Sequence, residues 1–261
     1  MSENILEIKN LSKNFGGLAA VSDCSISVKK GSITGVIGPN GSGKTTLFNL
    51  IAGNLKSSSG NINFNNEDIT NVPSYELFSK GLLRTFQIAH EFSNLSVLEN
   101  LMMVPANQSG ENLINNFLKP NLIKQEENDV KNKAKEVVDF LNLGHLSNEL
   151  AGNLSGGQKK LLELGRTMMV DAKLVLLDEV GAGVNRTLLK DLGTAIEKLN
   201  KEKGYTFCMI EHDMDFIGRL CDPVIVMAEG SVLFEGKVED AKKDEKVIES
   251  YLGRGSKLKD N

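Results

Sequence analysis

The sequence predicts an α/β fold built on a mostly parallel sheet. Runs of four to six apolar residues alternate with segments of helical periodicity, and strands that are apolar throughout are typical of a parallel sheet covered on both faces. A glycine-rich turn follows the first of these strands, and two adjacent acids follow the second. Because α/β folds bind ligands at the carboxyl ends of their strands, both features predict a binding site there. The strands are expected at residues 33–37, 174–177, 205–210 and 224–227.

The rest of the chain completes a single predicted domain over residues 1–261. Residues 4–35 alternate short β-rich runs with turns, and another strand and turn is expected at 61–69, with Asn65 and Asn66 at the bend. Helices are expected at 124–141, 157–170, 187–203 and 213–220. The predicted parts are an α/β core at 1–85 and 158–252, a helical subdomain at about 86–157 with a polar insertion near 104–121, and a tail at 253–261.

Composition excludes several classes of protein. The 261 residues carry a net charge of −4, and this acidic balance argues against a nucleic-acid partner. No segment approaches the roughly 20 apolar residues of a membrane-spanning helix, so at a membrane another chain would supply the pore. The three cysteines are far apart and form no C-x-x-C pair, which predicts small buried side chains rather than a zinc site or disulfides.

The segment that follows the first apolar strand, GPNGSGKT at 38–45, matches the phosphate-binding pattern G-x-x-x-x-G-K-[ST]. Its glycines let backbone N–H groups turn toward phosphate oxygens, and the next helix presents its positive end to them. Lys44 is long enough to reach the β- and γ-phosphates, and the Thr45 hydroxyl can bind Mg²⁺. The sequence therefore predicts binding of ATP and Mg²⁺, with candidate residues Gly38, Asn40, Gly41, Ser42, Gly43, Lys44, Thr45 and Thr46.

The acids Asp178 and Glu179 follow the second strand. A buried strand carries them to the rim of the sheet, where Asp178 is expected to hold Mg²⁺ directly or through water. Glu179, one residue further on, points elsewhere and is a candidate to polarise the attacking water. Without the phosphate loop upstream, the pair would be interpreted as an ordinary solvated strand end.

Three further segments resemble the ATPase subunits of ABC transporters: the sequence LSGGQ at 154–158, Gln87 within RTFQ, and His212 after the strand at 205–210. The resemblance extends from about residue 5 to 252. It implies a P-loop NTPase (RecA-like) parallel-sheet core with an N-terminal antiparallel β part and a helical subdomain. It also implies catalytic roles for Gln87 and His212, a metal-binding role for Gln87, and stacking of Phe15 on adenine, although Phe15 could instead be a core residue.

The LSGGQ segment has a physical interpretation of its own. Its serine and glycines precede a helical run and form a helix start with free N–H groups, which is a second anion site. The resemblance implies a head-to-tail dimer in which this segment of one subunit closes on the ATP of the other. The nucleotide-binding residues implied are Ser155, Gly156, Gly157 and Gln158.

Several segments resemble more closely the ATPases of branched-chain amino acid importers, among them LSKNFGGL at 11–18, RTFQ at 84–87, VLENL at 97–101 and AGVN at 182–185. That resemblance implies two transmembrane permease subunits, a second ATPase subunit that is identical or paralogous, and a periplasmic substrate-binding protein that acts indirectly. The expected location is peripheral, on the cytoplasmic face of the bacterial inner membrane. Uptake of urea or amides, and lipopolysaccharide export, remain alternatives.

Two residues depart from the general family pattern. Val180 stands where proline normally follows the catalytic glutamate, and a β-branched residue is expected to keep Glu179 extended, less strictly than proline would. Asn185 replaces an aspartate and matches the amino acid importers. A soluble ATPase acting on ribosomes or DNA is disfavoured by the single cassette and the acidic balance. A small-molecule phosphotransferase would leave LSGGQ and His212 unexplained.

Overall fold

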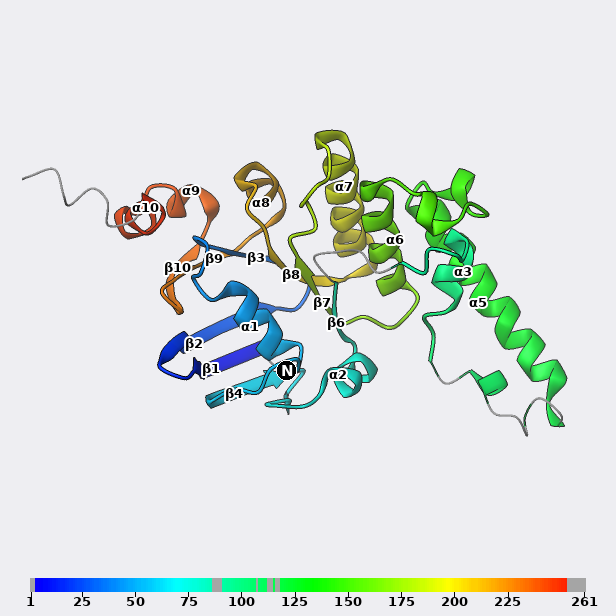
Figure 1. Cartoon of the computed structure of the whole chain (residues 1–261), viewed down its shortest axis with the longest axis horizontal. Helices are drawn as coiled ribbons and strands as arrows, with labels where there is room; N and C mark the ends of the chain where they lie inside the picture. The colour runs from blue at the N-terminus through cyan, green and yellow to red at the C-terminus, as the bar shows by residue number, and fades with distance from the viewer. Residues whose placement is uncertain (1–2, 86–90, 107, 112–114, 116–117, 253–261) are drawn as a thin grey trace, which may run out of the picture. The chain divides into compact units, whose positions relative to one another are not determined.

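The structure, a computed structural model, describes residues 3–85, 91–106, 108–111, 115 and 118–252. Two compact units make up the chain (Figure 1). The core unit comprises residues 1–84, 173–181 and 196–261, and the helical unit comprises 85–172 and 182–195. The expected boundary near 157 differs from this division, because helix α6 (Gly156–Met168) packs against α3 (Val97–Met102) and α5 (Pro120–Phe140).

The core unit begins with an antiparallel sheet of four strands in the order β2-β1-β4-β5. Short strands were expected over residues 4–35, but β1 and β2 are 12 residues each, because register shifts along their ladder absorb the polar interruptions. Asn65 and Asn66 both have positive φ, which confirms the predicted bend. The strands are β1 (Asn4–Phe15), β2 (Leu18–Lys29), β4 (Ser59–Phe64) and β5 (Glu67–Asp68).

The second sheet has six strands in the order β10-β9-β3-β8-β7-β6. Strand β10 pairs antiparallel with β9, and every other pairing in the sheet is parallel. The predicted strands are confirmed, with β3, β7 and β8 buried along their whole lengths. The strands are β3 (Ile33–Ile37), β6 (Leu82–Arg84), β7 (Leu174–Asp178), β8 (Thr206–Ile210), β9 (Val224–Ala228) and β10 (Ser231–Gly236).

One hydrophobic core joins both sheets to helix α1 (Lys44–Ile51), whose Phe48 is fully buried. Gly53, at φ 70°, follows the end of α1. The cysteines are free and buried, as predicted. The unit also contains α2 (Ser74–Lys80), α8 (Met214–Leu220), α9 (Val238–Ala241), α10 (Glu245–Leu252) and the second part of α7 (Arg186–Lys203).

The helical unit packs α3, α5 and α6 together (Figure 1). Helix α5 begins earlier than residue 124, because Pro120 suits the first turn of a helix. Its apolar face includes Ala134, Val137 and Val138, which are buried. The described part of the unit also contains short 3-10 turns at Ser109–Glu111, Gly144–Leu146 and Ala151–Asn153. Among the described residues, no helix is both long and apolar enough to cross a membrane.

Candidate nucleotide-binding and catalytic site

The phosphate loop joins the buried strand β3 to helix α1, the context that its sequence predicted. Gly38 has φ 146° and Gly43 has φ 100°. A Cβ at Gly38 would lie 2.1 Å from the Met227 carbonyl oxygen, and one at Gly43 would lie 2.4 Å from that of Ala20. Both positions therefore require glycine for space as well as for conformation.

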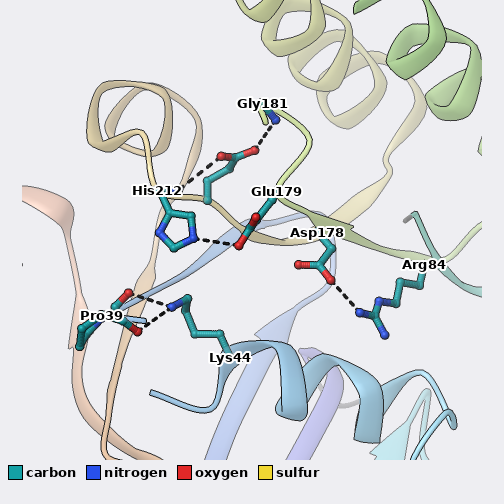
Figure 2. Close-up of polar contacts among 9 residues, drawn as sticks. Pro39, Lys44, Arg84, Asp178, Glu179, Gly181 and His212 are labelled. Carbon is teal, nitrogen blue, oxygen red and sulfur yellow. Dashed lines mark hydrogen bonds and ion pairs between the residues drawn. The ribbon is translucent and has the colours of Figure 1, made fainter. Parts of the chain in front are cut away.

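Two side chains of the loop, those of Lys44 and Ser42, are buried. Lys44 is buried, and its Nζ donates to the carbonyl oxygens of Gly38 at 2.8 Å and Pro39 at 3.0 Å (Figure 2). Burial lowers the pKa of Lys44, while the nearby carboxylates of Glu179 and Asp178 act in the opposite direction. The Ser42 hydroxyl is buried without a hydrogen-bond partner among the described residues. A phosphate oxygen would supply that partner, so the loop fits a nucleotide phosphate.

Asp178 ends strand β7 and is buried. Its Oδ2 accepts a hydrogen bond of 2.6 Å from Nη2 of Arg84, at the end of the neighbouring strand β6 (Figure 2). Nη1 of Arg84 donates to Oδ1 of Asn49 on α1, also at 2.6 Å. The predicted acid is therefore at the end of its strand, within a charged pair that the sequence analysis did not identify.

Glu179 turns sharply away from the strand. Its φ is 49°, in the left-handed region, and its N–H donates to the Ile210 carbonyl oxygen at 2.9 Å. Oε1 lies 2.8 Å from Nε2 of His212, so the structure brings together the two predicted catalytic residues (Figure 2). The expectation that Glu179 is extended was wrong. Val180 lacks the ring with which proline disfavours α-type backbone conformations in the preceding residue.

Glu211 is a buried acid that sequence reasoning missed. Its Oε1 accepts from the Gly181 N–H at 2.7 Å, and its Oε2 accepts from the His212 N–H at 3.3 Å. Burial raises the pKa of Glu211, and so does the charge of Glu179, against the effect of both backbone donors. The Glu211 carboxylate thus links the turn at Gly181 to the backbone of His212, whose side chain contacts Glu179. The only sequence cue was an acid directly after an apolar strand and before His212.

The LSGGQ segment belongs to the helical unit, where Ser155 caps helix α6. A capping box links Ser155 and Gln158: each side chain accepts from the other residue's backbone N–H. Those two N–H groups are therefore not free, which corrects the expectation for this helix start. For the N–H groups of Gly156 and Gly157, no acceptor is recorded among the residues that the structure describes.

Comparison with known proteins identifies this arrangement. The family model of the ABC transporter matches residues 21–182. The chain belongs to the ABC transporter family. It is 45% identical over 249 residues to a probable branched-chain amino acid transport ATP-binding protein, LivG, of Archaeoglobus fulgidus, with 95% of each chain covered. It is 34% identical over 253 residues to the high-affinity branched-chain amino acid transport ATP-binding protein BraF of Pseudomonas aeruginosa, covering 97% of this chain and 99% of BraF.

Solved ABC cassettes share the fold over the full length. A nucleotide-free ATP-binding cassette from an ABC transporter superposes with a TM-score of 0.83 at 41% identity, covering 96% of this chain and 100% of the cassette. A solved ADP conformation of an ATP-binding cassette of an ABC transporter gives a TM-score of 0.83 at 40% identity, covering 97% of this chain and 100% of that cassette. The chain is accordingly an ATP-binding cassette that hydrolyses ATP, and its core unit has the P-loop NTPase fold.

Other candidate residues of the cassette have distinct surroundings. Phe15 ends β1 with 47% of its surface exposed and Lys13 Nζ 5.2 Å from its ring centre, so it is not a core residue. Thr45 lies in the first turn of α1 and is exposed. Asn185 caps α7, its Oδ1 accepting from the Leu188 N–H at 3.0 Å, which gives the amide a local role. Gln87 lies outside the described residues.

Proposed function

We propose that the chain is the ATP-hydrolysing subunit of an importer for branched-chain or other small amino acids. Support comes from full-length similarity to LivG and BraF, proteins named for branched-chain amino acid transport. In this proposal the chain acts with two transmembrane permease subunits, a second ATPase subunit and, indirectly, a periplasmic substrate-binding protein. It lies peripherally on the cytoplasmic face of the bacterial inner membrane.

The core unit offers oxygen ligands that suit Mg²⁺. The Asp178 carboxylate and the Thr45 hydroxyl are the proposed protein ligands in the core unit, and ATP phosphates and water would complete the shell. The family resemblance implies Gln87 as a further ligand. Among the described residues, no group of three or more His, Cys, Asp or Glu side chains could hold a metal ion. When bound, Mg²⁺ neutralises phosphate charge.

The chain's own residues would divide the remaining work. Backbone N–H groups of the loop at 38–45 and the Lys44 ammonium hold the phosphates. Glu179 orients and deprotonates the attacking water, and His212, at 2.8 Å from its Oε1, holds that carboxylate in place. Phe15 supports the adenine ring, and residues 155–158 of a second subunit contact the same nucleotide.

Glu179→Gln tests the catalytic assignment. The amide keeps the shape of the side chain but cannot accept the proton, so turnover should fall by about 10²- to 10⁴-fold while ATP affinity stays near wild type. Phosphate release and nucleotide binding are measured on the same preparation. Glu239→Gln, at an exposed position on α9, is the matched control and should leave both values unchanged. Near-normal turnover of Glu179→Gln would show that another group is the base.

Uptake measurements test the transport assignment. Cells lacking the chain are complemented with wild type or with Glu179→Gln, and uptake of labelled leucine, other amino acids and urea is followed. We expect uptake of leucine or of a related small amino acid only with wild type. A defect restricted to urea would reassign the substrate. Unchanged uptake with altered export of envelope lipid would refute the importer proposal and leave the ATPase intact.

A further inference from the structure

The Arg84 side chain has a position that nucleotide binding does not require. It ends strand β6 with only 12% of the side chain exposed. A buried guanidinium must find acceptors, and Arg84 has two at short distance. Nη2 donates to Asp178 Oδ2 and Nη1 donates to Asn49 Oδ1, each at 2.6 Å. All three residues belong to the core unit.

The two acceptors lie on the two described elements that carry the proposed Mg²⁺ ligands. Asp178 ends β7 and is itself a proposed ligand. Asn49 lies on α1, four residues after Thr45 and therefore about one helical turn further along. One rigid, planar guanidinium thus links the strand that carries the carboxylate to the helix that carries the hydroxyl.

The contact also orients the carboxylate. Arg84 engages Oδ2, which fixes the rotation of the Asp178 side chain and leaves Oδ1 for a metal ion or its water (Figure 2). Groups that hydrogen-bond a metal ligand hold it in the binding orientation, and their loss weakens metal binding. We propose that Arg84 is a positioning residue for Mg²⁺. Its two hydrogen bonds, to Asp178 and to Asn49, hold the Asp178 carboxylate and helix α1 at the relative positions that the metal ion requires.

This inference rests on the proposed Mg²⁺ site, and it competes with a simpler idea. A cation beside Asp178 could merely repel Mg²⁺ or occupy its place, and its removal would then tighten metal binding. Arg84→Lys separates the two, because lysine keeps the charge but cannot span both acceptors as a fork. Asn49→Leu removes the second acceptor without changing any charge.

The measurement is metal affinity of the full chain in saturating ADP, with Mn²⁺ as the probe, detected by electron paramagnetic resonance. We expect Arg84→Lys to weaken Mn²⁺ binding by about 10-fold, and Asn49→Leu to weaken it in the same direction. The double variant should bind no more weakly than Arg84→Lys, since both act through one fork. Affinity for ADP without metal should not change. Lys80→Gln, which breaks the ion pair with Glu67 on the same unit, should leave Mn²⁺ affinity unchanged.

Asp178→Asn separates failure of the inference from failure of the metal site. If Asp178→Asn weakens Mn²⁺ binding but Arg84→Lys leaves it unchanged or tightens it, Arg84 does not position the ligand. If the losses of Mn²⁺ affinity add up in the double variant, Arg84 and Asn49 act independently, and the proposed link through Asn49 is wrong. If Asp178→Asn has no effect, the proposed metal site itself is wrong. Thermal melting checks folding; should Arg84→Lys fail to fold, unchanged affinity in Asn49→Leu overturns the proposal.

Discussion

Glu179, the proposed catalytic base, has a strained backbone. Its φ of 49° lies in a region that costs non-glycine residues about 1–3 kcal/mol and that is concentrated at functional sites. Two hydrogen bonds hold the turn: Glu179 donates to Ile210, and Gly181 donates to Glu211. Val180 is buried beside them. Valine instead of proline at position 180 therefore affects which backbone conformation Glu179 adopts, and not only how rigidly it is held.

Val180→Pro should disturb the site. Proline disfavours the conformation of Glu179 seen here, so the turn must change, at an expected loss of about 1–3 kcal/mol in the free energy of unfolding. Turnover should fall as Glu179 moves relative to His212. Urea denaturation and phosphate release measure the two effects. Val180→Ile, which keeps the backbone free, is the control. Unchanged stability and turnover in the proline variant would mean that Glu179 works equally well in an extended conformation.

Glu211 makes a pH-dependent contribution to stability. Its pKa is raised in the folded state, so stability from the protonated form is fully present below the unfolded pKa of about 4.3 and is lost as pH rises through the folded pKa. Glu211→Gln cannot ionise at this position. The free energy of unfolding of the variant, relative to wild type, should therefore rise as the pH increases from the unfolded to the folded pKa of Glu211, and stay constant above that range. Urea titrations at several pH values measure this. Glu202→Gln, exposed on α7, is the control; a flat difference for Glu211→Gln would contradict the assignment.

At the scale of elements, the start of helix α6 carries a proposed nucleotide contact and a packing contact with α7. The two glycines of LSGGQ have different surroundings. A Cβ at Gly157 would lie 2.7 Å from the Cβ of Leu188 on α7, whereas a Cβ at Gly156 would meet nothing nearer than the Gly183 carbonyl oxygen at 3.9 Å. Gly157 is thus required by the close approach of two helices within the helical unit, and Gly156 is available for a ligand.

The two glycines should respond differently to alanine. Gly157→Ala must push α7 away from α6, so we expect a lower melting temperature of the free chain, equivalent to about 1–3 kcal/mol. Gly156→Ala, the matched control, should melt near wild type. Calorimetry without nucleotide makes the comparison. Equal melting of both variants would show that the α6–α7 contact relaxes at no cost.

At the scale of the whole molecule, the predicted nucleotide contacts are divided between the two units. The phosphate loop, Asp178, Glu179 and His212 belong to the core unit, and the LSGGQ segment belongs to the helical unit. The family resemblance implies that the two sets meet on one nucleotide only across a pair of subunits. Each bound ATP would then add contacts to both partners.

ATP that is not hydrolysed should therefore promote dimers. We expect Glu179→Gln with ATP and Mg²⁺ to shift from monomer to dimer, measured by size-exclusion chromatography with light scattering. Ser155→Glu in the same background should prevent the shift, because its carboxylate would repel the phosphates at the second anion contact. A monomer under all conditions, with candidate paralogous subunits included, would contradict head-to-tail pairing.

The fold and most of the core-unit site could be predicted because they follow from local patterns. Apolar runs gave β3, β7, β8 and β9 to within a residue at each end, and the glycine pattern located the phosphate loop between strand and helix. Asp178 and Glu179 were identified because their position at a strand end is a property of sequence order. Helix and strand periodicity depends on residues only a few positions apart, so it can be recognised in the sequence alone.

By itself, then, the sequence determined the order of the strands along the chain, the residues of the phosphate loop and the family. Only the tertiary structure decided which distant groups meet. Arg84 and Asp178 are 94 positions apart, and Gly181 and Glu211 are 30 apart. The left-handed turn at Glu179 likewise depends on hydrogen bonds that Glu179 and Gly181 donate to Ile210 of β8 and to Glu211. Such contacts form only when strands far apart in sequence become neighbours in one sheet, and no local periodicity encodes that pairing.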